Sequence, residues 1–245
     1  MDCPLYKKPY IFSNETKVYF LREFVKRGKT CYRCGQPANT KEHMPPKSFF
    51  PKGGNLQLKT VPSCKEHNND KSGDDQYLLA HICMNAGSGQ NLPKQIFMRS
   101  VAPYLQKSEK FRKSLADGSI GLPNCARRYI VGNARLDNFF DHLSYAVYFD
   151  RYGIPLDEQK HKIGHCYLSL QTEDSLELSQ REFLSSALGT FYRTFQEVVS
   201  RYQADKLVES VYKNIIVHPA GKEASITIVH TFYGIFDVVS LLSRK

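Results

Sequence analysis

The sequence predicts an α+β protein with a small module of two strands and a helix, a mainly helical region, and a small antiparallel sheet at the C-terminal end. Three observations support this class. Two pairs of Cys and His residues bracket residues 31–67. Apolar residues then recur at helical spacing through much of the chain, and short β-rich runs bounded by turn residues follow after residue 210.

The two Cys/His pairs have the spacing of a metal site. Cys31 and Cys34 form a Cys-x-x-Cys pair, and Cys64 and His67 form a Cys-x-x-His pair. Two such pairs separated by a loop of this length match a tetrahedral zinc site. With four protein ligands the zinc would have no open position. We therefore expect a structural ion that holds the loop to the helix and contributes folding free energy.

The segment between the pairs contains a second group of polar residues. Glu42 and His43 are adjacent and precede a Pro-Pro-Lys-Ser sequence, and Asn68 directly follows His67. Turn residues and apolar spacing predict local structure in the following order: a turn at 37–40, a strand at 41–44, a basic loop at 47–55, a strand at 56–61 and a helix that starts around 64–67.

This pattern resembles the HNH (ββα-metal) endonucleases, especially the endonuclease VII-like members with a structural zinc. The residues that match are Cys31, Cys34, Glu42, His43, Pro46, Lys47, Val61, Pro62, Cys64, His67, Asn68 and Lys71. The resemblance implies that His43 is a general base and that Glu42 and Asn68 bind a catalytic Mg²⁺ or Mn²⁺. It also implies that the protein hydrolyses phosphodiester bonds of DNA.

The implied chemistry is physically reasonable for these residue types. A neutral imidazole, with an ordinary pKa near ~6.5, can accept a proton from water at neutral pH. A divalent ion held by one carboxylate and one amide oxygen keeps open positions for phosphate oxygens, as Mg²⁺ usually does.

Two positions depart from the family pattern. His67 stands where a fourth Cys is usual, although imidazole is an ordinary zinc ligand. The middle Asn that braces the loop in the family is replaced by Gln57, and the nearest asparagine is Asn55. Either residue remains a candidate for the loop brace.

Composition indicates the kind of partner. The 245 residues contain 34 Lys and Arg against 24 Asp and Glu, which gives a net charge of +10. This balance favours a polyanion, and DNA is the first candidate. Five lysines of the module are the candidate phosphate contacts, with solvated surface residues as the alternative for each: Lys47, Lys52, Lys59, Lys65 and Lys71.

The chain has no features of secretion or membrane insertion. Seven cysteines are an odd number, and three of them belong to the metal-like pattern. The first residues lack the apolar core of a signal peptide, and no run of eighteen apolar residues occurs. We therefore expect a reducing, cytoplasmic location and no membrane partner.

Helical periodicity covers much of the rest of the chain. We expect a helix at 13–27 that leads into the metal module, and a helix that runs from 76 to Gly87. We also expect a helical segment at 94–118, interrupted at Pro103, with one basic face. This face either contacts DNA or is an ordinary solvated surface. Further helices are expected at 135–150 and 179–206.

The C-terminal region predicts strands and a supporting role. The run 161–170 resembles a strand, and the runs 211–219, 224–234 and 235–242 read as three antiparallel strands. We expect two regions, 1–75 as the nuclease module and 76–245 for substrate positioning, oligomerisation or binding of a protein partner. The whole layout is similar to prokaryotic HNH proteins with suspected roles in defence against phage.

Three functional hypotheses follow. The first is a metal-dependent HNH endonuclease that cuts DNA. The alternative is a zinc-stapled nucleic-acid-binding module without cleavage activity, which would not require Glu42, His43 and Asn68 together. A purely structural zinc scaffold for protein contacts would leave the positive charge unexplained.

Overall fold

The computed structural model describes residues 30–53, 56–69, 72–85, 91–123, 127–170, 174–194, 206–217 and 225–245. The helix expected at 13–27 lies outside these residues. Within them, helices and strands are mixed as the sequence predicts, and no helix of the described part is both long and apolar enough to cross a membrane.

The C-terminal sheet has four antiparallel strands in the order β5-β8-β7-β6. The strands are β5 (His161–Tyr167), β6 (Tyr212–Val217), β7 (Ile226–Phe232) and β8 (Phe236–Arg244). The prediction of three antiparallel C-terminal strands is confirmed. The strand expected at 161–170 joins the same sheet by pairing with β8, from His161 opposite Arg244 to Tyr167 opposite Val238.

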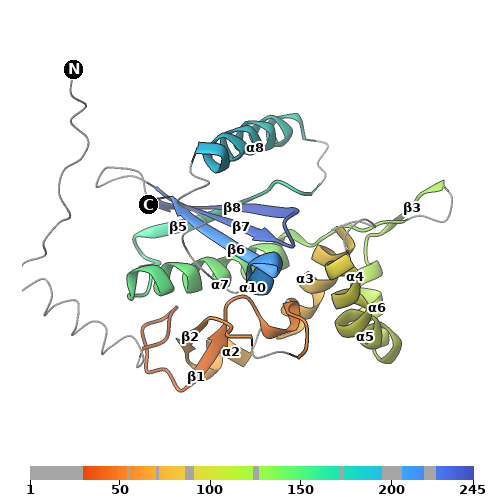
Figure 1. Ribbon diagram of the computed structural model, residues 1–245, viewed down its shortest axis with the longest axis horizontal. Helices are drawn as coiled ribbons and strands as arrows, with labels where there is room; N and C mark the ends of the chain where they lie inside the picture. Colours follow the sequence, from red (N-terminus) through yellow and green to blue (C-terminus); the bar gives the residue numbers. More distant parts are fainter. Residues whose placement is uncertain are drawn as a thin grey trace, which may run out of the picture.

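Two long helices lie on opposite sides of this sheet (Figure 1). Helix α7 (Asn133–Tyr152) buries Phe139 and Phe140, and the Phe140 ring contacts the ring of Phe232 on β7 at a centroid distance of 6.2 Å. Helix α8 (Ser175–Thr194) lies on the other side and is mostly exposed. A short helix, α10 (Lys206–Val211), leads directly into β6.

The N-terminal unit contains two short antiparallel strands and a helix. Strand β1 (Thr40–His43) pairs with β2 (Thr60–Ser63), a 3-10 turn η1 (Lys47–Phe49) lies between them, and α2 (Lys65–Asn69) follows. The second strand begins later than expected. The backbone N–H of Leu58 donates to the Leu56 carbonyl, so this segment makes a local turn instead of a ladder.

The middle region consists of several short helices. These are α3 (Ser72–Asn85), α4 (Asn91–Ile96), the π-helical turn η2 (Phe97–Val101), α5 (Ala102–Lys107) and α6 (Glu109–Ala116). Pro103 lies in the first turn of α5, and the Ser108 hydroxyl caps α6 by accepting from the Phe111 N–H. A projecting hairpin of β3 (Ile120–Gly121) and β4 (Arg127–Arg128) follows, which the sequence did not predict.

A single hydrophobic core includes residues from the N-terminal unit and from the C-terminal sheet. The ring of Phe49 lies 5.6 Å from that of Phe139 and 5.3 Å from that of Phe232. The Tyr233 hydroxyl donates to the Phe49 carbonyl at 3.0 Å. The division into 1–75 and 76–245 remains a prediction, and its boundary falls inside α3.

Histidines form a buried polar network between the sheet and α7. His230 Nε2 lies 3.1 Å from the Ser144 hydroxyl, and its Nδ1 lies 2.8 Å from the Tyr212 hydroxyl. Burial, together with the nearby His165, lowers the pKa of His230 to about 3. This imidazole is therefore held neutral inside the folded protein.

We expect this histidine to make the protein less stable in mild acid. Below the ordinary pKa of about 6.5, His230 is protonated in the unfolded chain but stays neutral in the folded protein. The free energy of unfolding therefore decreases as the pH falls towards 3. His230→Gln should remove about 1.4 kcal/mol per pH unit from the slope between pH 6 and 5, measured by urea unfolding. An unchanged slope in His230→Gln would contradict a neutral imidazole.

Candidate functional site

The Cys31–Cys34 segment is a tight turn built by backbone hydrogen bonds. The Gly35 N–H donates to the Cys31 carbonyl at 3.0 Å, and the Cys31 N–H donates to the Gln36 carbonyl at 2.7 Å. Gly35 has φ of +70°, in the left-handed region that glycine adopts without strain. The turn is tied to β2 because the Tyr32 N–H donates to the Pro62 carbonyl at 2.8 Å. Both sulfurs are thus delivered to one side of the hairpin.

The four predicted zinc ligands come together in space. Their ligand atoms all lie within 4.8 Å of one another, and they belong to Cys31, Cys34, Cys64 and His67. The Cys34 and Cys64 sulfurs are 4.0 Å apart, which is too far for a disulfide of about 2.05 Å. Imidazole Nδ1 of His67 faces the sulfurs, 3.1 Å from Cys64 and 3.8 Å from Cys31.

These distances fit a tetrahedral ion. Zinc–sulfur bonds of about 2.3 Å and zinc–nitrogen bonds of about 2.0 Å place tetrahedral ligand atoms roughly 3.5–3.8 Å apart. The observed separations of 3.1, 3.8 and 4.0 Å bracket these values. The cluster can therefore hold a metal ion such as zinc through three sulfurs and one nitrogen.

The surroundings of Cys31 favour a thiolate. Burial opposes ionisation of its sulfur, but backbone hydrogen bonds from Cys34, Arg33 and Cys64 outweigh burial and lower the pKa of Cys31 below its ordinary value. Burial raises the pKa of Cys34 to about 11 in the absence of a cation. A bound cation would supply the positive charge that stabilises both thiolates.

The metal turn is also anchored to α7. The Tyr32 hydroxyl lies 2.9 Å from Nδ1 of His142, and the Tyr32 side chain is fully buried. The Arg33 guanidinium lies 4.6 Å from the Tyr145 ring centroid, and its Nε donates to Glu158 at 3.1 Å. The Cys/His cluster is therefore attached to the main helix of the fold through the contact of Tyr32 with His142.

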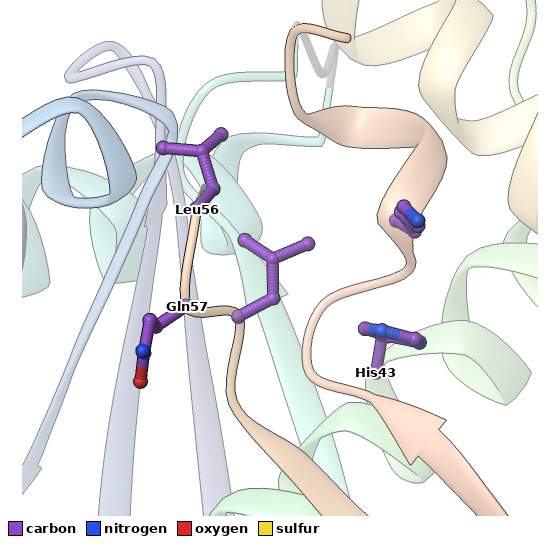
Figure 2. A pocket seen from close by; sticks show the side chains of 5 residues that line it. His43, Leu56 and Gln57 are labelled. Carbon is purple, nitrogen blue, oxygen red and sulfur yellow. The ribbon is translucent and has the colours of Figure 1, made fainter. Parts of the chain in front are cut away.

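His43 lies at the end of β1 and lines an open pocket of about 410 Å³. The other lining residues are Lys47, Leu56, Gln57 and Leu58, and Figure 2 shows His43 across the pocket from the segment of Leu56 and Gln57. Partial burial and the positive charge of Lys47 lower the pKa of His43 below 6.5. The direction of this shift favours the neutral imidazole, which is the form that a proton acceptor requires.

Glu42 and Asn68 lie close to His43 in the chain fold but do not line this pocket. Successive strand residues face opposite sides, and Glu42 is only 5% exposed, so its carboxylate faces the core side of β1. The Asn68 amide nitrogen donates to the Lys41 carbonyl at 3.4 Å, which places α2 beside β1. The Asn68 amide oxygen takes no part in this hydrogen bond and is therefore available to bind a cation.

Asp75 of α3 is a second carboxylate whose charge acts on Tyr32. Burial raises the pKa of Tyr32, and the negative charges of Glu42 and Asp75 raise it further. Carboxylate and amide oxygens suit Mg²⁺ or Mn²⁺, so Glu42 and Asn68 carry the kind of oxygen donors that such an ion requires.

The other predicted site residues differ in exposure and in their contacts. Lys47, Lys52 and Lys65 are exposed, whereas Lys59 forms an ion pair with Asp150 of α7 at 3.0 Å. Gln57 is exposed, its amide points away from His43 in Figure 2, and it has no side-chain hydrogen bond to another described residue. Asn55 and Lys71 lie outside the described residues, so the loop brace stays a prediction.

Comparisons of the chain with models of protein families, with curated proteins and with solved structures each found no match. The functional reading therefore depends on the geometry of these residues.

We expect Cys64→Ser to remove a structural metal. Native protein should contain about one zinc per chain, and the variant should lose it and unfold at lower temperature, because metal binding contributes to folding. Metal content by mass spectrometry and a thermal melt measure both effects. Cys166→Ser, a half-buried free cysteine in β5, is the matched control and should keep the zinc. A fully folded native protein without zinc would contradict the assignment.

Proposed function

We propose that the protein is a metal-dependent endonuclease of the HNH type that hydrolyses phosphodiester bonds of DNA. The observation that carries the proposal is His43, a neutral imidazole beside a lysine in an open pocket at the end of β1. A defence role against phage is the biological setting that the sequence resemblance suggests.

In this proposal each residue of the site has a separate chemical role. His43 accepts the proton of an attacking water, and exposed Lys47 attracts the scissile phosphate into the same pocket. Glu42 and Asn68 are the candidates to hold Mg²⁺ or Mn²⁺. Such an ion, when bound, would supply charge neutralisation at the leaving oxygen. The zinc would act only in folding, because all four of its ligands come from the protein.

One observation favours the alternative, a zinc-stapled nucleic-acid-binding module without cleavage. Glu42 faces the core side of β1, whereas His43 lines the pocket. A cleaving site requires the metal and the base to reach the same phosphate, and this arrangement separates their side chains. The alternative needs only the zinc cluster and the exposed lysines.

Cleavage of supercoiled plasmid with added Mg²⁺ or Mn²⁺ separates the two functions. His43→Ala should lower the cleavage rate by about 10²–10⁴-fold, because it removes the general base. Zinc content, thermal stability and DNA affinity should stay near wild type, since His43 is half-exposed and outside the Cys/His cluster. His161→Ala, a half-exposed histidine of the C-terminal sheet, is the matched control and should cut normally.

Asn68→Ala tests the metal role separately. Its cleavage should also fall, and higher Mg²⁺ or Mn²⁺ should restore part of it, because the defect is in metal affinity. The same addition should not restore His43→Ala. Undiminished cleavage by His43→Ala would exclude this residue as the base, and no cleavage by wild-type protein with either metal would favour the alternative.

A further inference from the structure

The region after α3 forms a lobe that the proposed catalytic site does not use. We define the basic lobe as residues 91–123 and 127–131, which contain α4, η2, α5, α6 and the paired strands β3 and β4. It contains eight Lys or Arg residues against two Asp or Glu residues. Its positive excess is more than half of the net charge of +10 of the whole chain.

Part of this charge is available at the surface. Lys94, Lys107 and Lys110 are exposed, and none forms an ion pair with another residue in the described part of the chain. Lys113 pairs with Glu109 at 2.8 Å one turn along α6. Arg112 is also exposed but donates to the Leu105 carbonyl at the end of α5. The exposed lysines Lys94, Lys107 and Lys110 therefore form no ion pair within the described residues that would account for their positions.

Large apolar side chains are exposed on the same lobe. Six of the twelve exposed large hydrophobic residues in the described chain belong to it, and four of these flank the hairpin. The four are Ile120 at 49%, Leu122 at 40%, Tyr129 at 40% and Ile130 at 49% exposure. Arg128 lies directly opposite Ile120 in the hairpin ladder. Exposed apolar groups concentrated in this way mark a binding surface.

The hairpin is held firmly at its base. Gly118, with φ of +66°, lies against the side chain of Ile130, so a Cβ at this position would be in contact with it at 3.6 Å. At the other end the Gly132 N–H donates to the Tyr77 hydroxyl of α3 at 3.2 Å. Arg135 stacks on the Tyr77 ring at 3.5 Å and donates to Asp74 at 2.7 Å. Figure 1 shows the hairpin projecting from this base.

The lobe is also joined to the wall of the His43 pocket. Arg99, in the π-helical turn, donates to the Phe50 carbonyl at 2.5 Å. Phe50 directly follows η1, which carries Lys47. Because π-helical turns often occur at functional sites, this contact suits a surface that continues from the pocket.

We propose that the basic lobe is a second contact surface for duplex DNA, with its lysines on the phosphate backbone and the β3–β4 hairpin in a groove. The proposal rests on the proposed function only for the nature of the partner. Exposed cations beside exposed aromatic and aliphatic side chains match a ligand with charged phosphates and apolar base edges.

The shape of the hairpin favours DNA over other partners. The major groove of B-DNA is about 12 Å wide and admits a two-stranded β-ribbon. The major groove of A-form RNA is deep and narrow, and side chains cannot read it. An acidic protein or membrane surface would satisfy the lysines but would not require a projecting ribbon.

Duplex binding by the intact, zinc-containing chain without Mg²⁺ or Mn²⁺ tests the lobe independently of cleavage. Fluorescence anisotropy with a 30-base-pair DNA is measured between 50 and 200 mM salt. Lys107→Gln with Lys110→Gln should weaken binding about tenfold or more and reduce the slope of log affinity against log salt by about two. The control is Lys162→Gln with Lys206→Gln, which removes the same charge from exposed positions on β5 and α10. It should change neither the DNA affinity nor the salt slope.

A second pair tests the groove contact. Ile120→Ser with Tyr129→Ser should weaken duplex binding at least about fivefold without changing the salt slope, because no phosphate contact is lost. Leu176→Ser with Phe183→Ser, two apolar residues that are even more exposed on α8, is the control. Wild-type affinity in both lobe variants would overturn the proposal, even if plasmid is cut. Stronger binding to duplex RNA or anionic vesicles than to DNA, lost in the same variants, would also overturn it.

Discussion

The joining of two distant chain segments by the Cys/His cluster is the constraint on which the proposed site depends. One pair of ligands lies in the turn before β1, and the other lies at the start of α2 after β2. A strand pair of four residues each has little stability of its own. A metal bound by both pairs would hold the hairpin to the helix, and His43 sits at the end of that hairpin. A metal bound at this cluster would therefore help to set the position of the His43 imidazole.

The hydrophobic core provides the second support. Helix α7 contacts the metal turn through Tyr32 and Arg33, and it also packs against the sheet through Phe140. Phe49, beside the pocket loop, packs against both α7 and β7. The N-terminal unit and the C-terminal sheet thus share one core, so the packing of the sheet also supports the segment that contains Phe49.

Electrostatics link the pocket to the rest of the surface. Burial and then the positive charge of Lys47 lower the pKa of His43. The hydrogen bond from Arg99 to the Phe50 carbonyl joins the basic lobe to the segment that follows η1. Arg99 turns inward and serves packing, whereas Lys107 and Lys110 remain exposed. Only the exposed lysines are placed to act on a partner.

Local patterns in the sequence determined the Cys/His cluster, the strands β6 to β8 and the helix α7, because ligand spacing and apolar periodicity depend on residues close together in the chain. The orientation of Glu42 towards the core and the pairing of Lys59 with Asp150 were decided only by the tertiary structure. The β3–β4 hairpin was also revealed only by the tertiary structure, because strands of two residues are too short to show alternating hydrophobicity in the sequence. Each of these features results from contacts between residues distant in sequence, and such contacts exist only once the core has formed.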